Sequence, residues 1–116
     1  MIRVYSYAKC STCRKALAWL TERGIEHEVR EIKEEQPTQE ELQQMLAAKE
    51  GEIRKLFNTS GMDYRAMGLK DQMGSMSEAE AFALLQGNGM LVKRPFVIGE
   101  GVALTGFREK EWETSF

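Results

Sequence analysis

The chain has 116 residues, of which 42% are hydrophobic and 29% charged, and its formal net charge is −2 at pH 7. This length suits one domain with a real core and is too short for two independent domains. The mild acidity argues against a general nucleic-acid binder, and no apolar run approaches membrane-spanning length. No secretory signal opens the chain, and two cysteines are too few for a disulfide scaffold. We therefore expect a cytoplasmic monomer with neither a membrane nor a direct nucleic-acid partner.

The first predicted elements are a strand and a helix, with the two cysteines at their junction. Residues 2–7 alternate in polarity as a strand does. From Cys13 to Leu20, apolar residues recur at i, i+3, i+4 and i+7, which is typical of an amphipathic helix. Gly24 is expected to end this helix, and residues 28–32 predict a second strand.

A block of helices is predicted next. Thr38 with Glu41 and Ser77 with Glu80 each form the capping-box pattern that begins a helix. The expected helices run from Thr38 to about Gly51, over about 53–57, over 64–67 and from Ser77 to about 87.

The hydrophobic period then changes. Residues 96–98 and 102–104, joined by a glycine-rich turn at 99–101, predict a hairpin, and a short helix is expected over 108–112. The order β-α-β, helices, β-β-α predicts an α/β thioredoxin-like (glutaredoxin-like) sheet with a helical insertion between its two halves. We expect a single domain, residues 1–116, with its core at about 1–33 and 91–116. The insertion is then at about 34–90.

Cys10-Ser11-Thr12-Cys13 is the most informative motif. It places Cys10 at the positive end of a helix, where unpaired N–H groups and the helix dipole stabilise a thiolate, the reactive form of cysteine. Ser11 or Thr12 is expected to cap that helix. Neighbouring positive charges act in the same direction: Lys9, Arg14 and Lys15. Because Cys13 lies within disulfide reach, the motif predicts a redox-active disulfide, with Cys10 as nucleophile and Cys13 as resolving thiol.

Two other interpretations of the cysteines are weaker. Structural zinc needs two further ligands, and the chain has no third cysteine and only one histidine, His27. Both thiols could instead be inert core residues, and Cys13 is partly that, since it lies on the apolar stripe. The position between strand and helix favours the redox interpretation, with no metal and no cofactor.

Arg94-Pro95 is the second informative site. A proline before an apolar strand is by itself most often trans. In a thioredoxin-like fold, however, the loop entering the third strand carries a cis-proline that faces the C-x-x-C motif. This predicts a cis Arg94–Pro95 bond and a guanidinium on the side of Cys10. There it could stabilise the thiolate or bind an oxyanion, and the alternative is a solvated surface arginine.

Over essentially its whole length the sequence resembles the arsenate reductase/Spx family. The resemblance is carried by Tyr5, by the block from Lys9 to Ala16, by Gln36-Pro37-Thr38 with Glu41-Leu42, by Phe57 to Gly61 with Tyr64, by Leu91 to Pro95, and by Gly106-Phe107 with Glu109 and Trp112. It implies that Cys10 matches the cysteine that attacks arsenate in the glutaredoxin-linked reductases. Arg94 matches one of the arginines that hold the oxyanion there.

Two departures from those reductases bear on the activity. Asn58 stands where they have a second arginine, and a third falls at Gly106 or Phe107, with Arg108 only a stand-in. Arg94 would then be the one arginine left to hold arsenate. Cys13 occupies a position that is usually serine. The resemblance therefore implies a complete dithiol switch and an incomplete arsenate site.

Two functions follow. The first is a cytosolic thiol-disulfide oxidoreductase, with glutaredoxin, thioredoxin or a low-molecular-weight thiol as electron donor. The alternative is an Spx-like, redox-switched transcriptional regulator that binds RNA polymerase. Members of the Spx branch usually continue into a basic tail, whereas this sequence stops at Phe116, which favours the enzyme.

Overall fold

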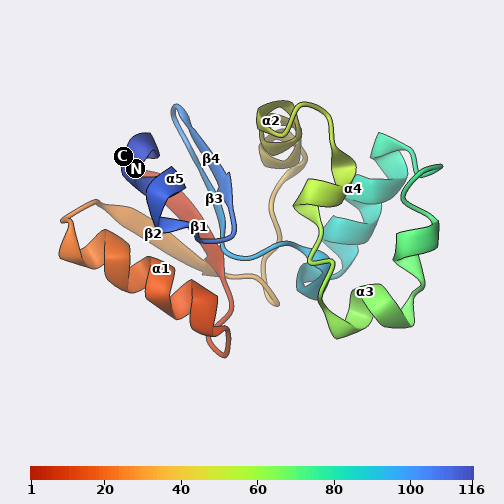
Figure 1. Ribbon diagram of the computed structural model, residues 1–116, viewed down its shortest axis with the longest axis horizontal. Coiled ribbons are helices and arrows are strands. Elements are labelled where there is room, and N and C mark those ends of the chain that lie inside the picture. Colours follow the sequence, from red (N-terminus) through yellow and green to blue (C-terminus); the bar gives the residue numbers. More distant parts are fainter.

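Four strands form one mixed sheet in the order β2-β1-β3-β4 in the computed structural model, which describes all residues 1–116 (Figure 1). The strands are β1 (Ile2–Ser6), β2 (His27–Glu31), β3 (Phe96–Gly99) and β4 (Val102–Thr105). Strand β1 pairs with β2 in parallel and with β3 antiparallel, and β3 and β4 form the hairpin. This topology is that of a thioredoxin-like fold and confirms the predicted fold class.

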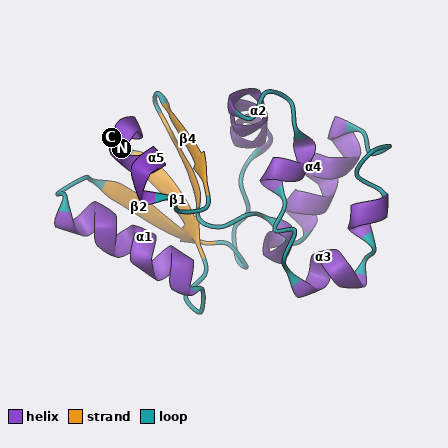
Figure 2. Cartoon of the chain, viewed as in Figure 1, coloured by secondary structure: helices purple, strands orange, loops and turns teal.

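The helices are close to the predicted ones. They are α1 (Ser11–Glu22), α2 (Gln39–Ala48), α3 (Met62–Ala66), α4 (Glu78–Gly87) and α5 (Glu109–Ser115), with 3-10 turns η1 (Ile53–Leu56), η2 (Leu69–Asp71) and η3 (Gly89–Leu91). Both capping boxes are present. The turns η2 and η3 were not predicted. Helix α5 begins one residue later than expected and continues past Trp112. All strands lie in one half of the molecule, and the other half consists of helices and loops (Figure 2).

The two faces of the sheet are covered by different parts of the chain. Ile2 and Val4 point to one face, where they pack in a cluster with residues of α1, β4 and α5. Tyr5 and Phe96 point to the other face, where they join a larger cluster built mostly from α2 to η3. This alternation is the period-2 pattern of a sheet that is buried on both faces. The helical insertion therefore packs against one face, and α1 with α5 against the other.

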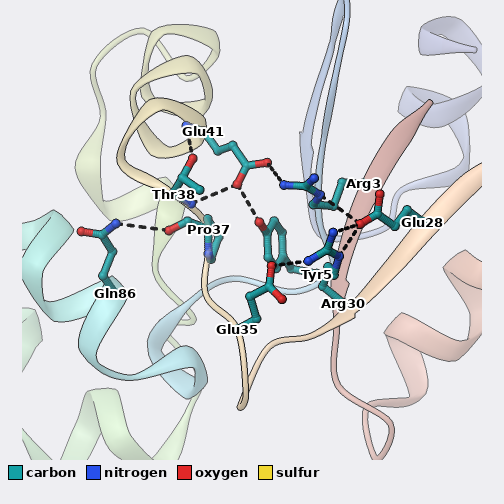
Figure 3. A network of polar contacts seen from close by, with 9 residues as sticks. All are labelled: Arg3, Tyr5, Glu28, Arg30, Glu35, Pro37, Thr38, Glu41 and Gln86. Carbon is teal, nitrogen blue, oxygen red and sulfur yellow. Dashed lines mark hydrogen bonds and ion pairs between the residues drawn. The ribbon is translucent and has the colours of Figure 1, made fainter.

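A polar network joins the insertion to the sheet (Figure 3). The buried Tyr5 hydroxyl donates a hydrogen bond of 2.6 Å to Glu41 Oε1, and Arg3 Nη1 donates one of 3.2 Å to Glu41 Oε2. Glu41 also accepts from the backbone N–H of Thr38 at 2.9 Å, which closes the capping box of α2. One carboxylate thus caps the first insertion helix and binds the central strand β1.

A second connection lies at the end of the insertion. The N–H of Asn58 donates to the carbonyl of Leu91 at 2.7 Å, and the N–H of Lys93 donates to the carbonyl of Leu56 at 2.9 Å. These bonds hold Asn58 beside the loop that enters β3. The Arg94–Pro95 bond in that loop is cis, which confirms the prediction. Separately, none of the helices combines the length and the apolar character needed to cross a membrane.

Candidate active site

Cys10 itself caps helix α1. Its backbone is extended (φ −91°, ψ 115°), and its Sγ accepts a hydrogen bond from the N–H of Cys13 at 3.4 Å. The expectation that Ser11 or Thr12 caps the helix is wrong, because both residues already lie in the first helical turn. A sulfur in the capping position receives the N–H and the helix dipole directly, and a thiolate is a better acceptor than a thiol.

Cys13 lies one helical turn further on and is fully buried, whereas Cys10 is partly exposed. Both are free thiols. Burial raises the pKa of Cys13 to about 11, and its hydrogen-bonding interaction with Cys10 acts in the same direction. Cys13 therefore stays protonated near neutral pH, while Cys10 is the thiol that solvent can reach. No group of three or more His, Cys, Asp or Glu side chains is placed to hold a metal ion.

Cys10 and Arg94 line the same open cleft of about 680 Å³, which we call the cationic cleft. Six basic residues and one acidic residue line it. The full lining is Cys10, Thr12, Lys49, Arg54, Lys55, Phe57, Asn58, Thr59, Ser60, Lys93, Arg94, Thr105, Gly106, Phe107, Arg108 and Glu111. The structure thus confirms that Arg94 lies on the side of Cys10, and it adds five further cations.

The neighbours that hold Arg94 in place are uncharged, so they do not neutralise its guanidinium. Its guanidinium carbon lies 5.1 Å from the centre of the Tyr7 ring, and its Nη1 donates to Met90 Sδ at 3.3 Å. It forms no salt bridge with any carboxylate. Arg94 is therefore not a solvated surface arginine, because it is half-buried against an aromatic ring and a thioether.

Arg108 lines the cationic cleft as the structure stands. The N–H of Gly106 donates to the carbonyl of Pro95 at 3.0 Å, and the buried indole N–H of Trp112 donates to the carbonyl of Gly106 at 3.2 Å. These two bonds fix the loop before α5 beside the loop of Arg94. Because Arg54 also lines the cleft, the expectation that Arg94 is the one arginine at the site is wrong.

Sequence reasoning missed four of the basic residues: Lys49, Arg54, Lys55 and Lys93. No local pattern marks them, since Lys49 ends α2, while Arg54 and Lys55 belong to η1. Lys93 could have been found from its place beside Arg94. Conversely, the cations expected to help Cys10 from its own segment, Lys9, Arg14 and Lys15, are exposed and do not line the cleft.

Comparison with known proteins decides the family. Residues 5–115 match the ArsC family. The chain belongs to that family. Among curated proteins, the chain is 42% identical over 112 residues to the uncharacterized protein YusI of Bacillus subtilis, covering 97% of this chain and 95% of YusI.

Two further relatives carry functional descriptions. A solved structure from Streptococcus mutans, described as a possible arsenate reductase, superposes with a TM-score of 0.90 at 39% identity, covering 100% of this chain and 98% of the other. The global transcriptional regulator Spx of Staphylococcus haemolyticus is 29% identical over 111 residues, covering 96% of this chain and 83% of Spx. The proteins similar to this chain thus include one described as a possible arsenate reductase and one described as a transcriptional regulator.

Proposed function

We propose that this ArsC-family protein is a thiol-disulfide oxidoreductase in which Cys10 is the nucleophile, Cys13 the resolving thiol and Arg94 an anion-holding residue. The observation that carries the proposal is the unequal placement of the two thiols. Cys10 caps α1 and opens into the cationic cleft, while Cys13 is buried one turn behind it. A reachable thiolate backed by a protected second thiol is the arrangement that dithiol exchange requires.

The reaction consists of two exchanges. The Cys10 thiolate attacks one sulfur of a substrate disulfide, forms a mixed disulfide with that half and releases the other half as a thiolate. Cys13 then loses its proton to solvent, attacks the Cys10 sulfur and releases the second half. Two electrons pass from the dithiol to the substrate, and the protein keeps a Cys10–Cys13 disulfide. A thiol donor, such as glutaredoxin, thioredoxin or a low-molecular-weight thiol, returns both electrons.

The proposal is tested with bis(2-hydroxyethyl) disulfide as an uncharged substrate and dithiothreitol as donor, following thiol release. We expect turnover by the native protein and none above background by Cys10→Ser, because no other thiol lines the cleft and Cys13 is fully buried. When dithiothreitol is left out, Cys13→Ser should stop after the first exchange and accumulate a mixed disulfide on Cys10, because no resolving thiol is present to reduce it. Mass spectrometry of the intact protein detects that adduct.

The matched control is Ser11→Ala, which removes a hydroxyl beside Cys10 that caps nothing in the structure. It should retain the native rate. Equal turnover by Cys10→Ser and the native protein would exclude this function. Adduct formation on Cys13 instead of Cys10 would reverse the two roles.

A second candidate function is a redox-switched regulator that binds RNA polymerase, and the similarity to Spx favours it. In this case the dithiol state would control binding, and turnover would be absent. Capture of polymerase from a bacterial lysate by the oxidised protein, but not by the reduced protein or by Cys10→Ser, would support the regulator.

A further inference from the structure

The cationic cleft holds more positive charge than a thiolate at Cys10 requires. Besides Arg94 and Arg54, it contains a group of four basic side chains, Lys49, Lys55, Lys93 and Arg108, which we call the cation cluster. The only acidic residue on the cleft wall is Glu111. Because like charges repel, such a group is unfavourable unless an anion neutralises it.

The four side chains come from three separate parts of the chain, and the fold holds them together. Lys49 caps the end of α2, and Lys55 lies on η1. The side chain of Lys93 lies against Gly106, where an added Cβ would come within 3.2 Å of the lysine Cε. Arg108 follows Gly106 on the loop that the indole of Trp112 fixes. The cluster is therefore a product of tertiary structure.

Electrostatic evidence agrees with this geometry. Burial lowers the pKa of Lys49. The charges of Lys55, Lys93 and Arg108 also lower it, and Glu111 opposes them. Within the cluster only Lys55 forms a salt bridge, an exposed one of 3.1 Å to Glu52. Lys49, Lys93 and Arg108 form no salt bridge and can therefore bind an anionic ligand.

The shape and lining of the cleft indicate the kind of ligand. Its volume of about 680 Å³ is in the range of about 300–1,000 Å³ that is typical of small-molecule sites. Only three of its sixteen lining residues are hydrophobic, so charge and hydrogen bonds must supply most of the affinity. A phosphate group carries about −1.5 to −2 charges at pH 7 and offers three acceptor oxygens, and it matches arginine and lysine donors better than a single carboxylate does.

We propose that the preferred substrates are small disulfides whose phosphate groups lie at a distance from the sulfur atoms. This inference rests on the proposed thiol-disulfide exchange. The cation cluster binds the phosphates while Cys10 attacks the sulfur. The exchanges are those given above, so each turnover releases two phosphate-bearing thiols and oxidises the Cys10–Cys13 pair. A thiol reductant then restores the pair.

The test compares kcat/KM for four disulfides with the same dithiothreitol donor. Cystamine is cationic, bis(2-hydroxyethyl) disulfide is neutral, glutathione disulfide carries carboxylates, and coenzyme A disulfide carries phosphates. We expect the rates to rise in that order, with coenzyme A disulfide at least about tenfold above the neutral substrate at low ionic strength. This advantage should shrink as salt approaches about 1 M, where the screening length falls to about 3 Å.

Paired variants test the assignment to the cation cluster. In Lys49→Gln/Lys93→Gln the ratio of kcat/KM for coenzyme A disulfide over the neutral disulfide should fall at least about tenfold, because two of the cluster's charges are lost. The matched control is Lys70→Gln/Lys110→Gln, which removes the same charge from two exposed positions outside the cleft and should keep the native ratio. The salt dependence is measured on the native protein, so it tests the electrostatic preference even if a double variant fails to fold.

The outcomes separate this inference from the function on which it rests. Turnover of all four disulfides at rates unrelated to their charge overturns the phosphate preference and leaves the oxidoreductase in place. An equal loss of the ratio in both double variants assigns the effect to net charge and also overturns the inference. Turnover of none of the four overturns the proposed function and this inference together.

Discussion

Tyr5→Phe removes one hydroxyl from the network that joins the insertion to the sheet. The hydroxyl donates a 2.6 Å hydrogen bond to the Glu41 carboxylate, and the Tyr5 side chain is fully buried. Phenylalanine keeps the ring and its edge-on contact with Phe96, at 5.9 Å between centroids, so packing is unchanged. A hydrogen bond to a charged group contributes about 1.5–3 kcal/mol, and we therefore expect the free energy of unfolding to fall by about 2 kcal/mol.

The dependence on pH gives this prediction a second measurable consequence. Burial raises the pKa of Tyr5 from 10 to about 12, and the hydrogen bond to Glu41 adds to this. The unfolded state therefore releases the phenolic proton first as the pH rises. The contribution of Tyr5 to stability is complete below about pH 10 and is lost as the pH rises toward about 12, at up to about 1.4 kcal/mol per pKa unit.

Urea unfolding of the native protein and of Tyr5→Phe, near neutral pH and between about pH 9 and about pH 11, measures both effects. The stability difference should be largest below about pH 10 and narrow above it. Tyr7→Phe is the matched control, since the Tyr7 hydroxyl takes no part in the hydrogen bonds to Glu41 and its removal should cost under about 0.5 kcal/mol. Equal losses in the two variants, or a difference independent of pH, would refute the reasoning.

Three further predictions concern the thiols, the packing and the anion site. Iodoacetamide should label Cys10 first in the reduced protein near neutral pH, because Cys13 is buried and its pKa is raised; peptide mapping checks this, and labelling at equal rates would contradict it. Gly89→Ala should lower the free energy of unfolding by about 3 kcal/mol or more, since its Cβ would lie 2.0 Å from a backbone carbonyl oxygen, whereas Gly87→Ala, with open space around its Cβ, should be neutral or slightly stabilising in the same urea experiment. Arsenate, compared by kcat/KM with glutaredoxin or thioredoxin as donor, should be a poorer substrate than a disulfide. Asn58→Arg should improve its turnover at least about tenfold, because each charge-assisted hydrogen bond contributes about 1.5–3 kcal/mol; no improvement would show that Arg54 and Arg108 already supply the missing donors.

The elements of the fold could be predicted because their signals are local. The capping boxes that open at Thr38 and Ser77 depend on residues three apart, and both are present in the structure. The cap of α1 was assigned wrongly because a cysteine is not a usual N-cap, and only the backbone conformation shows that the helix begins at Ser11. The turns η2 and η3 begin without a capping box, and η3 is opened instead by Asn88, whose side-chain oxygen accepts a hydrogen bond from the N–H of Met90 at 3.0 Å.

The sequence by itself determined that Cys10 and Cys13 lie close together, because the helix that begins between them brings residues three apart to the same side. It also determined the thioredoxin-like order of elements, through the change of hydrophobic period along the chain. Only the tertiary structure decided the electrostatics around Cys10. Lys49 and Arg54 lie far from Arg94 and Arg108 in the sequence, and they meet in one cleft because the insertion packs on the sheet. Backbone hydrogen bonds also tie Leu56 and Asn58 of the insertion to Lys93 and Leu91, next to Arg94. A charge acts through distance in space, so its effect on a thiol cannot be counted along the chain.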